Sequence, residues 1–205
     1  KPLPATNGAP TTLPTAATYV YDVLAGTWVN HTGAGKVDPV VRYNASAASY
    51  NDGATASDWK GVIVGGASAF NDAGFNNAAV TSTTVVSITN GVPSFVAGPS
   101  LPAGRSTPGV TTSNGRFWVH GGAADTRGNA TGTSTMYSLQ AAPLGASWAA
   151  TAASSPNPRS SHVLFSFQSP DATPQFRTPA LLGQSGGTAR TDTAEYTTPV
   201  GTCTA

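Results

Sequence analysis

The residues of this 205-residue chain that could perform chemistry are few and widely spaced. Three histidines (His31, His120 and His162) lie far apart, and Cys203 is the single cysteine. His120 directly precedes a glycine pair at the end of an expected inner strand, where a metal ligand is conceivable. A half-buried histidine bonded to a backbone carbonyl is the commoner arrangement. We therefore predict no metal site.

Motifs of the other catalytic classes are missing. Gly183–Gly186 (GQSG) is one residue short of the nucleophile elbow GxSxG, and the phosphate loop GxxxxGK[ST] does not occur. Asp52 and Asp58 share one stretch, but they lack the partners that a calcium site or a glycosidase needs. We predict a chain without catalytic residues and without a cofactor.

The charge content argues against nucleic-acid binding and favours an extracellular protein. Only 9% of residues are charged, against about a quarter in typical proteins, and the net charge is +1. No basic stripe could neutralise a phosphate backbone. Three Asn-x-Ser/Thr sequons predict N-glycosylation of a secreted protein. Their asparagines are Asn30, Asn44 and Asn129.

Cys203 is the third residue from the end of the sequence and has no partner for an internal disulfide. Three interpretations remain open: an intermolecular disulfide, an idle terminal thiol, or a partner in sequence outside this chain. No run of about eighteen apolar residues predicts a transmembrane helix.

The elements that must position these residues are expected to be β-strands. Short apolar runs alternate with Gly, Pro, Ser and Asn, and no window has sustained helical periodicity. Thr18–Asp22 and Thr27–Asn30 predict a hairpin with Tyr21 and Trp28 on its packed side. The Asn90-Gly91 pair, between two apolar runs, predicts a second hairpin.

A repeat organises the chain. Each unit has an arginine, a strand, a strand ending in a glycine pair, a loop, a third strand, and a strand with a large aromatic residue. The arginines are Arg42, Arg105 and Arg159; the glycines are Gly65, Gly66, Gly121, Gly122, Gly186 and Gly187; the aromatic residues are Trp28, Phe95 and Trp148. Units of 50 to 60 residues with variable loops are typical of four-stranded blades.

With these features the chain resembles the kelch-repeat family of β-propellers. Tyr137 and Trp148 downstream of a glycine pair, and the run Pro158–His162 (PRSSH), carry the resemblance together with the repeat. It implies an all-β propeller of four-stranded antiparallel blades at residues 17–198, after a Pro/Thr-rich arm at 1–16 and before a tail at 199–205. It also implies that the arginines brace loops by donating to backbone carbonyls or to an acid such as Asp22 or Asp192.

The number of blades stays open at this point. The hairpin near the N-terminus would supply the outer two strands of a blade, and residues 160–198 the first three strands of another. Either the hairpin completes the last blade and closes a ring of about four blades, or the chain is part of a ring of six or seven.

Three functions are consistent with these features. The first is a secreted kelch-like propeller that acts as a non-catalytic binding or scaffold module. The second is an extracellular structural subunit of a wall, sheath or filament. The third is a lobe of a copper radical oxidase of the galactose oxidase type, against which stands the position of Cys203 beyond the last expected strand. The expected partner is another protein, or further copies of the chain, completing the terminal blades; a glycan ligand is also possible.

Overall fold

The computed structural model describes residues 17–51, 59–67, 78–124, 134–151, 158–169 and 175–199. All regular elements in these ranges are β-strands, which confirms the prediction of an all-β chain. Across the same ranges, no helix long and apolar enough to cross a membrane occurs.

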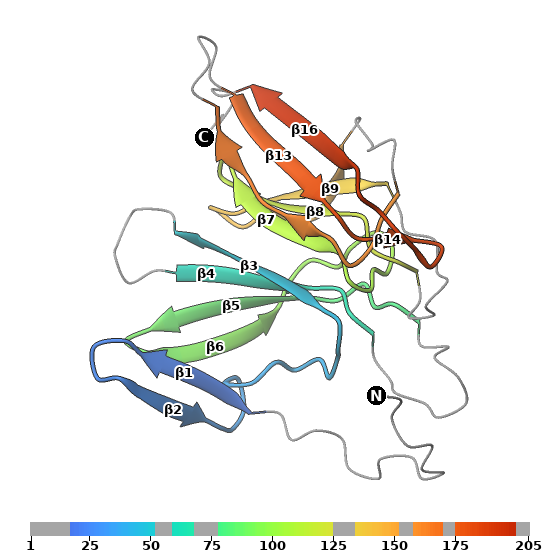
Figure 1. Ribbon diagram of the computed structural model, residues 1–205. Coiled ribbons are helices and arrows are strands. Elements are labelled where there is room, and N and C mark those ends of the chain that lie inside the picture. The colour runs from blue at the N-terminus through green and yellow to red at the C-terminus, as the bar shows by residue number, and fades with distance from the viewer. Residues whose placement is uncertain are drawn as a thin grey trace, which may run out of the picture.

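The strands fall into a hairpin and three larger sheets that follow one another along the chain (Figure 1). The N-terminal hairpin consists of β1 (Thr18–Asp22) and β2 (Thr27–His31). The first sheet consists of β3 (Ser46–Asn51), β4 (Trp59–Val64), β5 (Thr83–Thr89) and β6 (Val92–Ala97). The second sheet consists of β7 (Gly109–Ser113), β8 (Arg116–His120), β9 (Met136–Gln140) and β10 (Ala149–Ala150).

The third sheet is built around β13 (Gln175–Leu181). β11 (Val163–Leu164) and β12 (Phe167–Gln168) lie end to end along one edge of β13, and β16 (Thr193–Pro199) pairs with its other edge. A small hairpin of β14 (Gln184–Ser185) and β15 (Thr188–Ala189) lies between β13 and β16 in the sequence. All of these pairings are antiparallel.

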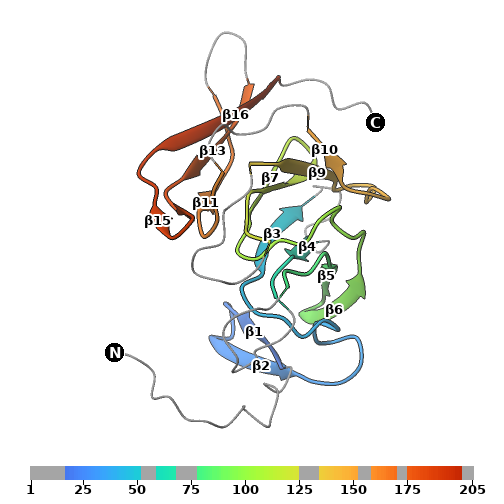
Figure 2. The ribbon, with the colours of Figure 1, turned by 90° about the vertical axis from the view of Figure 1, so that its right-hand side faces the viewer.

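The first strands of the three sheets lie side by side. β7 lies against β3 on one side and against β11 on the other, while the later strands of each sheet lie progressively farther out (Figure 2). β8, which carries His120, is therefore the second strand of its sheet and lies between β7 and β9.

The described residues do not form a closed ring. The N-terminal hairpin lies at one end of the array and the third sheet at the other (Figure 1). β16 already supplies the third strand of the third sheet, so adding β1 and β2 would give five strands. The alternative in which the hairpin completes the last blade is therefore not what this structure contains.

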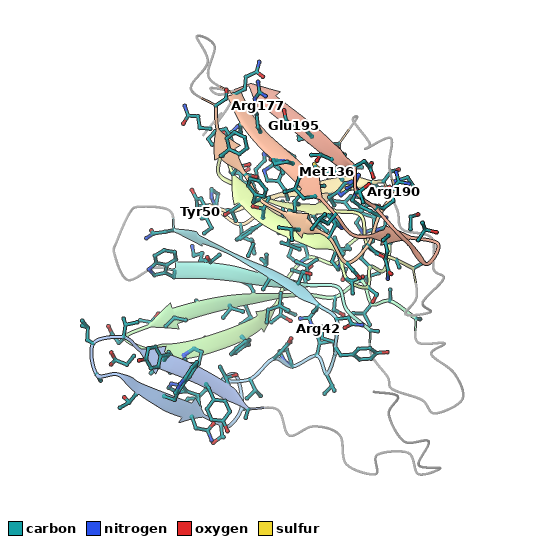
Figure 3. The ribbon with its side chains drawn as sticks, viewed as in Figure 1. Arg42, Tyr50, Met136, Arg177, Arg190 and Glu195 are labelled. Carbon is teal, nitrogen blue, oxygen red and sulfur yellow. The ribbon has the colours of Figure 1, made fainter. Side chains whose placement is uncertain are left out.

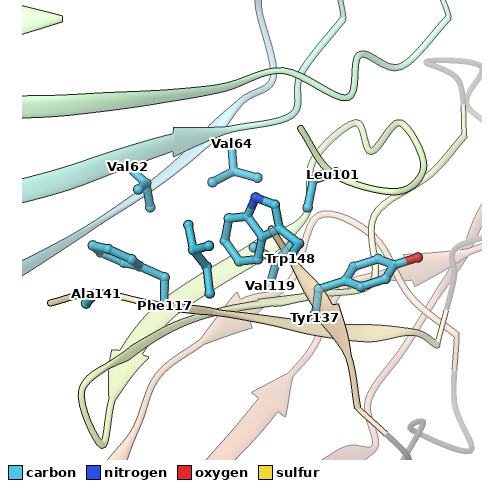
Figure 4. Packing of buried hydrophobic residues seen from close by; sticks show 9 residues of the cluster. Val62, Val64, Leu101, Phe117, Val119, Tyr137, Ala141 and Trp148 are labelled. Atoms are coloured by element: carbon cyan, nitrogen blue, oxygen red, sulfur yellow. The ribbon is translucent and has the colours of Figure 1, made fainter. Parts of the chain in front are cut away.

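The largest apolar core lies between the first and second sheets (Figure 4). Val62 and Val64 of β4 meet Phe117 and Val119 of β8, because alternate residues of a strand share one face. Trp148, which is 5% exposed, adds its ring to this core. Each such side chain stabilises the fold by about 1.5–3 kcal/mol when fully buried. The sheets are thus held to one another face to face.

The two predicted hairpins form, with one error in their orientation. Asn90 and Gly91 join β5 to β6 with φ values of 50° and 77°, as the two-residue hairpin turn requires. In the N-terminal hairpin, Tyr21 and Trp28 are opposite each other but lie on the exposed face, at 46% and 67% exposure. Val20 lies on the more buried face instead.

Candidate functional site

Each of the three repeat units contains an isolated β-bridge at the equivalent position. A residue next to the repeat arginine pairs with a residue just after the second long strand: Tyr43 with Ala67, Ser106 with Ala123, and Ser160 with Gln184. The backbone N–H groups and carbonyls of each pair bond reciprocally at 2.8–3.1 Å. These bridges align the three units residue by residue and show which positions are equivalent.

The glycine pairs of the first two units lie between the second strand and the bridge. Gly65, Gly66, Gly121 and Gly122 all have φ between 64° and 98°. A Cβ on Gly66 would approach the Tyr43 carbonyl oxygen to 2.7 Å, so both the backbone angle and the space require glycine.

In the third unit, the equivalent pair is Leu182-Gly183, and the assignment of Gly186 and Gly187 to this position is wrong. Gly183 has φ 96°, and its Cβ would lie 2.6 Å from the Ser160 carbonyl oxygen. Gly186 and Gly187 instead form the turn between β14 and β15. The spacing could have revealed this, because 24 residues separate both Arg42 from Gly66 and Arg159 from Gly183.

Arg42 and Arg159 hold the ends of the strands together. Nη1 of Arg42 donates to the carbonyls of Gly65 and Ser82 at 3.2 and 2.8 Å, and its Nε and Nη2 donate to the Asp38 carboxylate. Arg42 is visible beside the first sheet in Figure 3. The sequence did not single out Asp38, although a spacing of four residues before Arg42 was available as a signal.

Arg159 makes the corresponding contacts in the third sheet and is fully buried. Its Nη1 donates to the carbonyls of Ala180, Leu182 and Asp192 at 3.0–3.2 Å, and its Nη2 to the Asp192 carboxylate at 3.0 Å. A hydrogen bond from Arg190, with the charge of Arg159 nearby, holds the pKa of Asp192 below its ordinary value.

Arg105 differs from the other two arginines. It is 6% exposed, and its hydrogen bonds are long: 3.4 Å to the Gly104 carbonyl and 3.4 Å to the Tyr137 hydroxyl. Its guanidinium lies over the Tyr137 ring, 5.6 Å from the ring centre. Within the described ranges, no carboxylate pairs with it.

The fold brings two of the three histidines together between the second and third sheets. His120 Nδ1 lies 3.0 Å from His162 Nε2, and the two residues are 1% and 9% exposed. Burial, followed by the positive charges of Arg159 and Arg105, lowers the pKa of His120 to about 4. Burial, His120 and Arg159 lower the pKa of His162 to about 3. Both rings are therefore neutral at pH 7, and one donates to the other.

The histidine pair does not fit the copper site expected for a lobe of a copper radical oxidase of the galactose oxidase type. In the part of the chain that the structure describes, no group of three or more His, Cys, Asp or Glu residues is placed to hold a metal. Two guanidinium groups adjoin the histidines, and a positive surrounding opposes a bound cation. Cys203 lies outside the described residues. No redox step follows from this arrangement.

Of the predicted glycosylation sites, Asn30 and Asn44 are exposed. Asn30 lies on β2, and Asn44 has φ 55° just before β3. Asn129 lies outside the described residues.

The two tryptophans of the repeat occupy equivalent positions with opposite surroundings. Trp148 packs on the first sheet, and its Nε1 donates to Thr83 Oγ1 at 3.1 Å and to the Pro99 carbonyl at 3.0 Å. Trp28 lies against Tyr21, with the ring centres 5.0 Å apart and the rings tilted by 47°, and it is 67% exposed. Trp148 is therefore buried against the first sheet, whereas Trp28 remains mostly exposed.

A second incomplete surface lies on the first sheet, on the face opposite the core. A hollow of about 460 Å³ is lined there mostly by small and apolar residues. The hollow is bounded by Ala47, Ser49, Trp59, Gly61, Ile63, Val86 and Ile88, among others. The sequence did not predict it, because alternation shows which residues share a face without showing which face is covered.

Comparisons with known proteins relate the chain to a solved structure at the level of the fold. No family model matches the sequence, and no curated protein matches it. The solved structure of YjhT superposes with a TM-score of 0.60 at 14% identity, over 87% of this chain and 48% of YjhT. The chain therefore spans about half the length of YjhT.

Proposed function

We propose that this chain is a segment of a secreted, N-glycosylated, kelch-like β-propeller that acts as a non-catalytic binding or scaffold module. The adjacent first strands of the sheets, the repeated arginines and the bridges after the second strands support this architecture. The buried, neutral histidine pair offers no substrate an open ionisable group.

The observation that carries the proposal is the exposure of Trp28. Trp148 at the same repeat position is buried against the preceding sheet. Trp28 is 67% exposed beside Tyr19 and Tyr21, so the N-terminal hairpin carries the contact surface of a sheet that no other described strand covers on this side. Exposed apolar patches mark protein interaction sites, and aromatic residues are enriched in them, so we assign partner binding to this surface.

The opposite end of the array carries a similar surface. Val163, Phe165 and Phe167 are 55%, 39% and 43% exposed, and the two phenylalanine rings stack with centres 6.0 Å apart. YjhT, which shares the fold, has about as much chain outside the matched half as within it. Further sheets on both sides would bury both apolar surfaces.

These two ends also favour the second function, a structural subunit. Two different apolar surfaces at opposite ends of one chain can join head to tail, and such contacts generate either rings or filaments. Growth of assemblies with concentration would distinguish this function from a module with one defined partner.

The test is the oligomeric state and the intact mass of the native material, measured by light scattering and mass spectrometry. We expect a complex with further polypeptide, and a mass decrease on enzymatic removal of N-glycans that is lost in N30Q/N44Q/N129Q. Trp28→Ser should weaken association at least tenfold. Leu24→Ser, at a still more exposed residue in the hairpin turn, should not. A monomer without glycans and without any partner in native material would contradict the proposal.

A further inference from the structure

We propose that the hollow on the first sheet is a docking site for two antiparallel β-strands of a partner polypeptide, which pair with the free edge of β1. This inference rests on the proposed function and assigns to one of its surfaces the element that it binds. The occupant would convert the N-terminal hairpin into a four-stranded sheet like the first and second sheets.

The strand register shows that the hollow lies on the face turned away from the core. Gly61 is opposite Ser49 on one side and Val86 on the other, and these residues share a face. Their neighbours Val62 and Ala48 point to the opposite face, where they contribute to the core with the second sheet. Ala47 and Ser49 are exposed on the open face, in the first strand of the sheet.

The N-terminal hairpin already covers the adjoining part of this face. Thr18 and Tyr19 line a neighbouring hollow of about 430 Å³ with Phe95 of the outermost strand β6. Ile63 lines both hollows, so the open region continues directly from the covered one. Within the described residues β1 pairs along one edge with β2, and no strand pairs with its other edge.

The contact between the second and third sheets shows which kind of element would cover the open face of the first sheet. There the inner pair β7–β8 lies against the third sheet, and Trp118 of β8 packs on Tyr196 with ring centres 5.3 Å apart. Tyr196 is opposite Thr178 as Val86 is opposite Gly61, so Tyr196 and Val86 are equivalent. The open face of the first sheet is thus the surface on which an inner strand pair packs.

The described strands of this chain do not supply such a pair. β14 and β15 have two residues each, and β13 of the third sheet is already paired with β16 on one edge and with β11 and β12 on the other. We assign this position to a two-stranded hairpin from a partner, with apolar residues at alternate positions and a large side chain above Gly61. Backbone pairing with β1 would give affinity, and the apolar face would give specificity.

The probe for this test is a cyclised, fluorescently labelled peptide with the sequence of Gly109–His120, the inner strand pair that packs on the equivalent face of the third sheet. Cyclisation removes the requirement that an isolated hairpin be stable. We expect saturable 1:1 binding, measured by fluorescence anisotropy. Hydrogen exchange should slow in Thr18–Asp22 and in Trp59–Val64.

The matched variants place the same charge on two exposed alanines. Ala47→Glu, within the hollow, should weaken binding at least tenfold, and Ala150→Glu, on β10 of the second sheet, should change it less than twofold. Absence of saturable binding, equal effects of the two variants, or protection at the third sheet instead would overturn the proposal. So would a dimer of the chain alone that Ala47→Glu dissociates, because the occupant would then be a second copy. A chain that fails these tests yet still associates through Trp28 would leave the scaffold proposal standing.

Discussion

Arg159 shows how this weakly charged chain buries a full positive charge. Its guanidinium is fully buried, and three carbonyls and the Asp192 carboxylate accept its hydrogen bonds. A buried charge is tolerated only when its donors are satisfied in this way. The residue therefore fixes the positions of β13 and of the segment leading into β16.

Replacement of Arg159 by lysine should be strongly destabilising, because an ammonium group cannot reproduce the planar array of donors. We expect the free energy of unfolding to fall by about 3 kcal/mol, as in other buried pairs that lose a partner. Arg177→Lys is the matched control, because the Arg177–Glu195 pair is more than one-third exposed on both sides, and it should change stability by less than about 1 kcal/mol. Denaturant unfolding monitored by fluorescence measures both; equal losses would contradict this account.

The buried histidine pair makes stability depend on pH. The unfolded chain binds protons at these rings below about pH 6.5, while the folded chain resists them down to about pH 4 at His120 and pH 3 at His162. The contribution of the neutral histidine pair to the free energy of unfolding is therefore complete above about pH 7 and decreases as the pH falls.

At pH 5 we expect each histidine of the pair to reduce the free energy of unfolding by about 2 kcal/mol relative to pH 8. Denaturant titrations at a series of pH values measure this slope. His120→Gln/His162→Gln should flatten the slope even if it lowers stability overall, because glutamine does not titrate. A slope that the double variant leaves unchanged would place the acid sensitivity elsewhere.

At the scale of the elements, each second strand ends by turning sharply into a bridge. The turn needs a left-handed backbone next to the carbonyl of another segment. Leu182 occupies the first turn position in the third unit with φ 60°, so side chains are not excluded there. The second position is glycine in all three units, at Gly66, Gly122 and Gly183.

Gly183→Ala and Gly186→Ala separate the two roles of glycine in the third unit. The Cβ at position 183 would lie 2.6 Å from the Ser160 carbonyl oxygen, so backbone must move, and we expect a loss of more than about 2 kcal/mol. At position 186 nothing lies within 4 Å, and only the backbone angle costs about 1 kcal/mol. Thermal or chemical unfolding measures the difference; a larger effect at 186 would contradict the alignment by bridges.

Local sequence patterns predicted where the strands and turns of this fold form better than they predicted what each strand packs against. The Asn90-Gly91 pair identified a hairpin, because few dipeptides adopt its backbone angles. Alternation placed Tyr21 and Trp28 on one face, but which face is covered depends on segments far away in the sequence. The glycine pair at 186–187 resembled the other two in composition, and only the long-range bridge of Ser160 to Gln184 reveals its different place.

At the scale of the molecule, the tryptophans report on which interfaces are filled. Trp148→Ala removes a ring from the core between two sheets together with both of its hydrogen bonds, and we expect a loss of about 3–5 kcal/mol. Trp28→Ala should change the stability of the isolated chain by less than about 1 kcal/mol, because its ring is mostly in solvent. Unfolding curves of the two variants measure this; a large loss for Trp28→Ala would show that its face is covered within one chain.

The site could be predicted only in part for the same reason. The repeat arginines were recognisable from their spacing, but their partners come from segments up to about forty residues away, as in the contact of Arg42 with Ser82. The approach of His120 to His162 likewise depends on the stacking of two sheets, which no local pattern encodes. That the N-terminal hairpin does not complete the third sheet among the described residues became evident only from the pairing of β16 with β13.

The stacking of the sheets also governs how the molecule comes apart. Within the part of the chain that the structure describes, the second sheet is flanked on both faces, whereas the N-terminal hairpin and the third sheet each have a neighbour on one side. In a linear stack, a terminal layer can melt by breaking a single interface, while a central layer must break two. Amide protons in β8 and β9 should thus be the last to exchange and those of β1 and β2 among the first, so that the chain frays inward from its two ends.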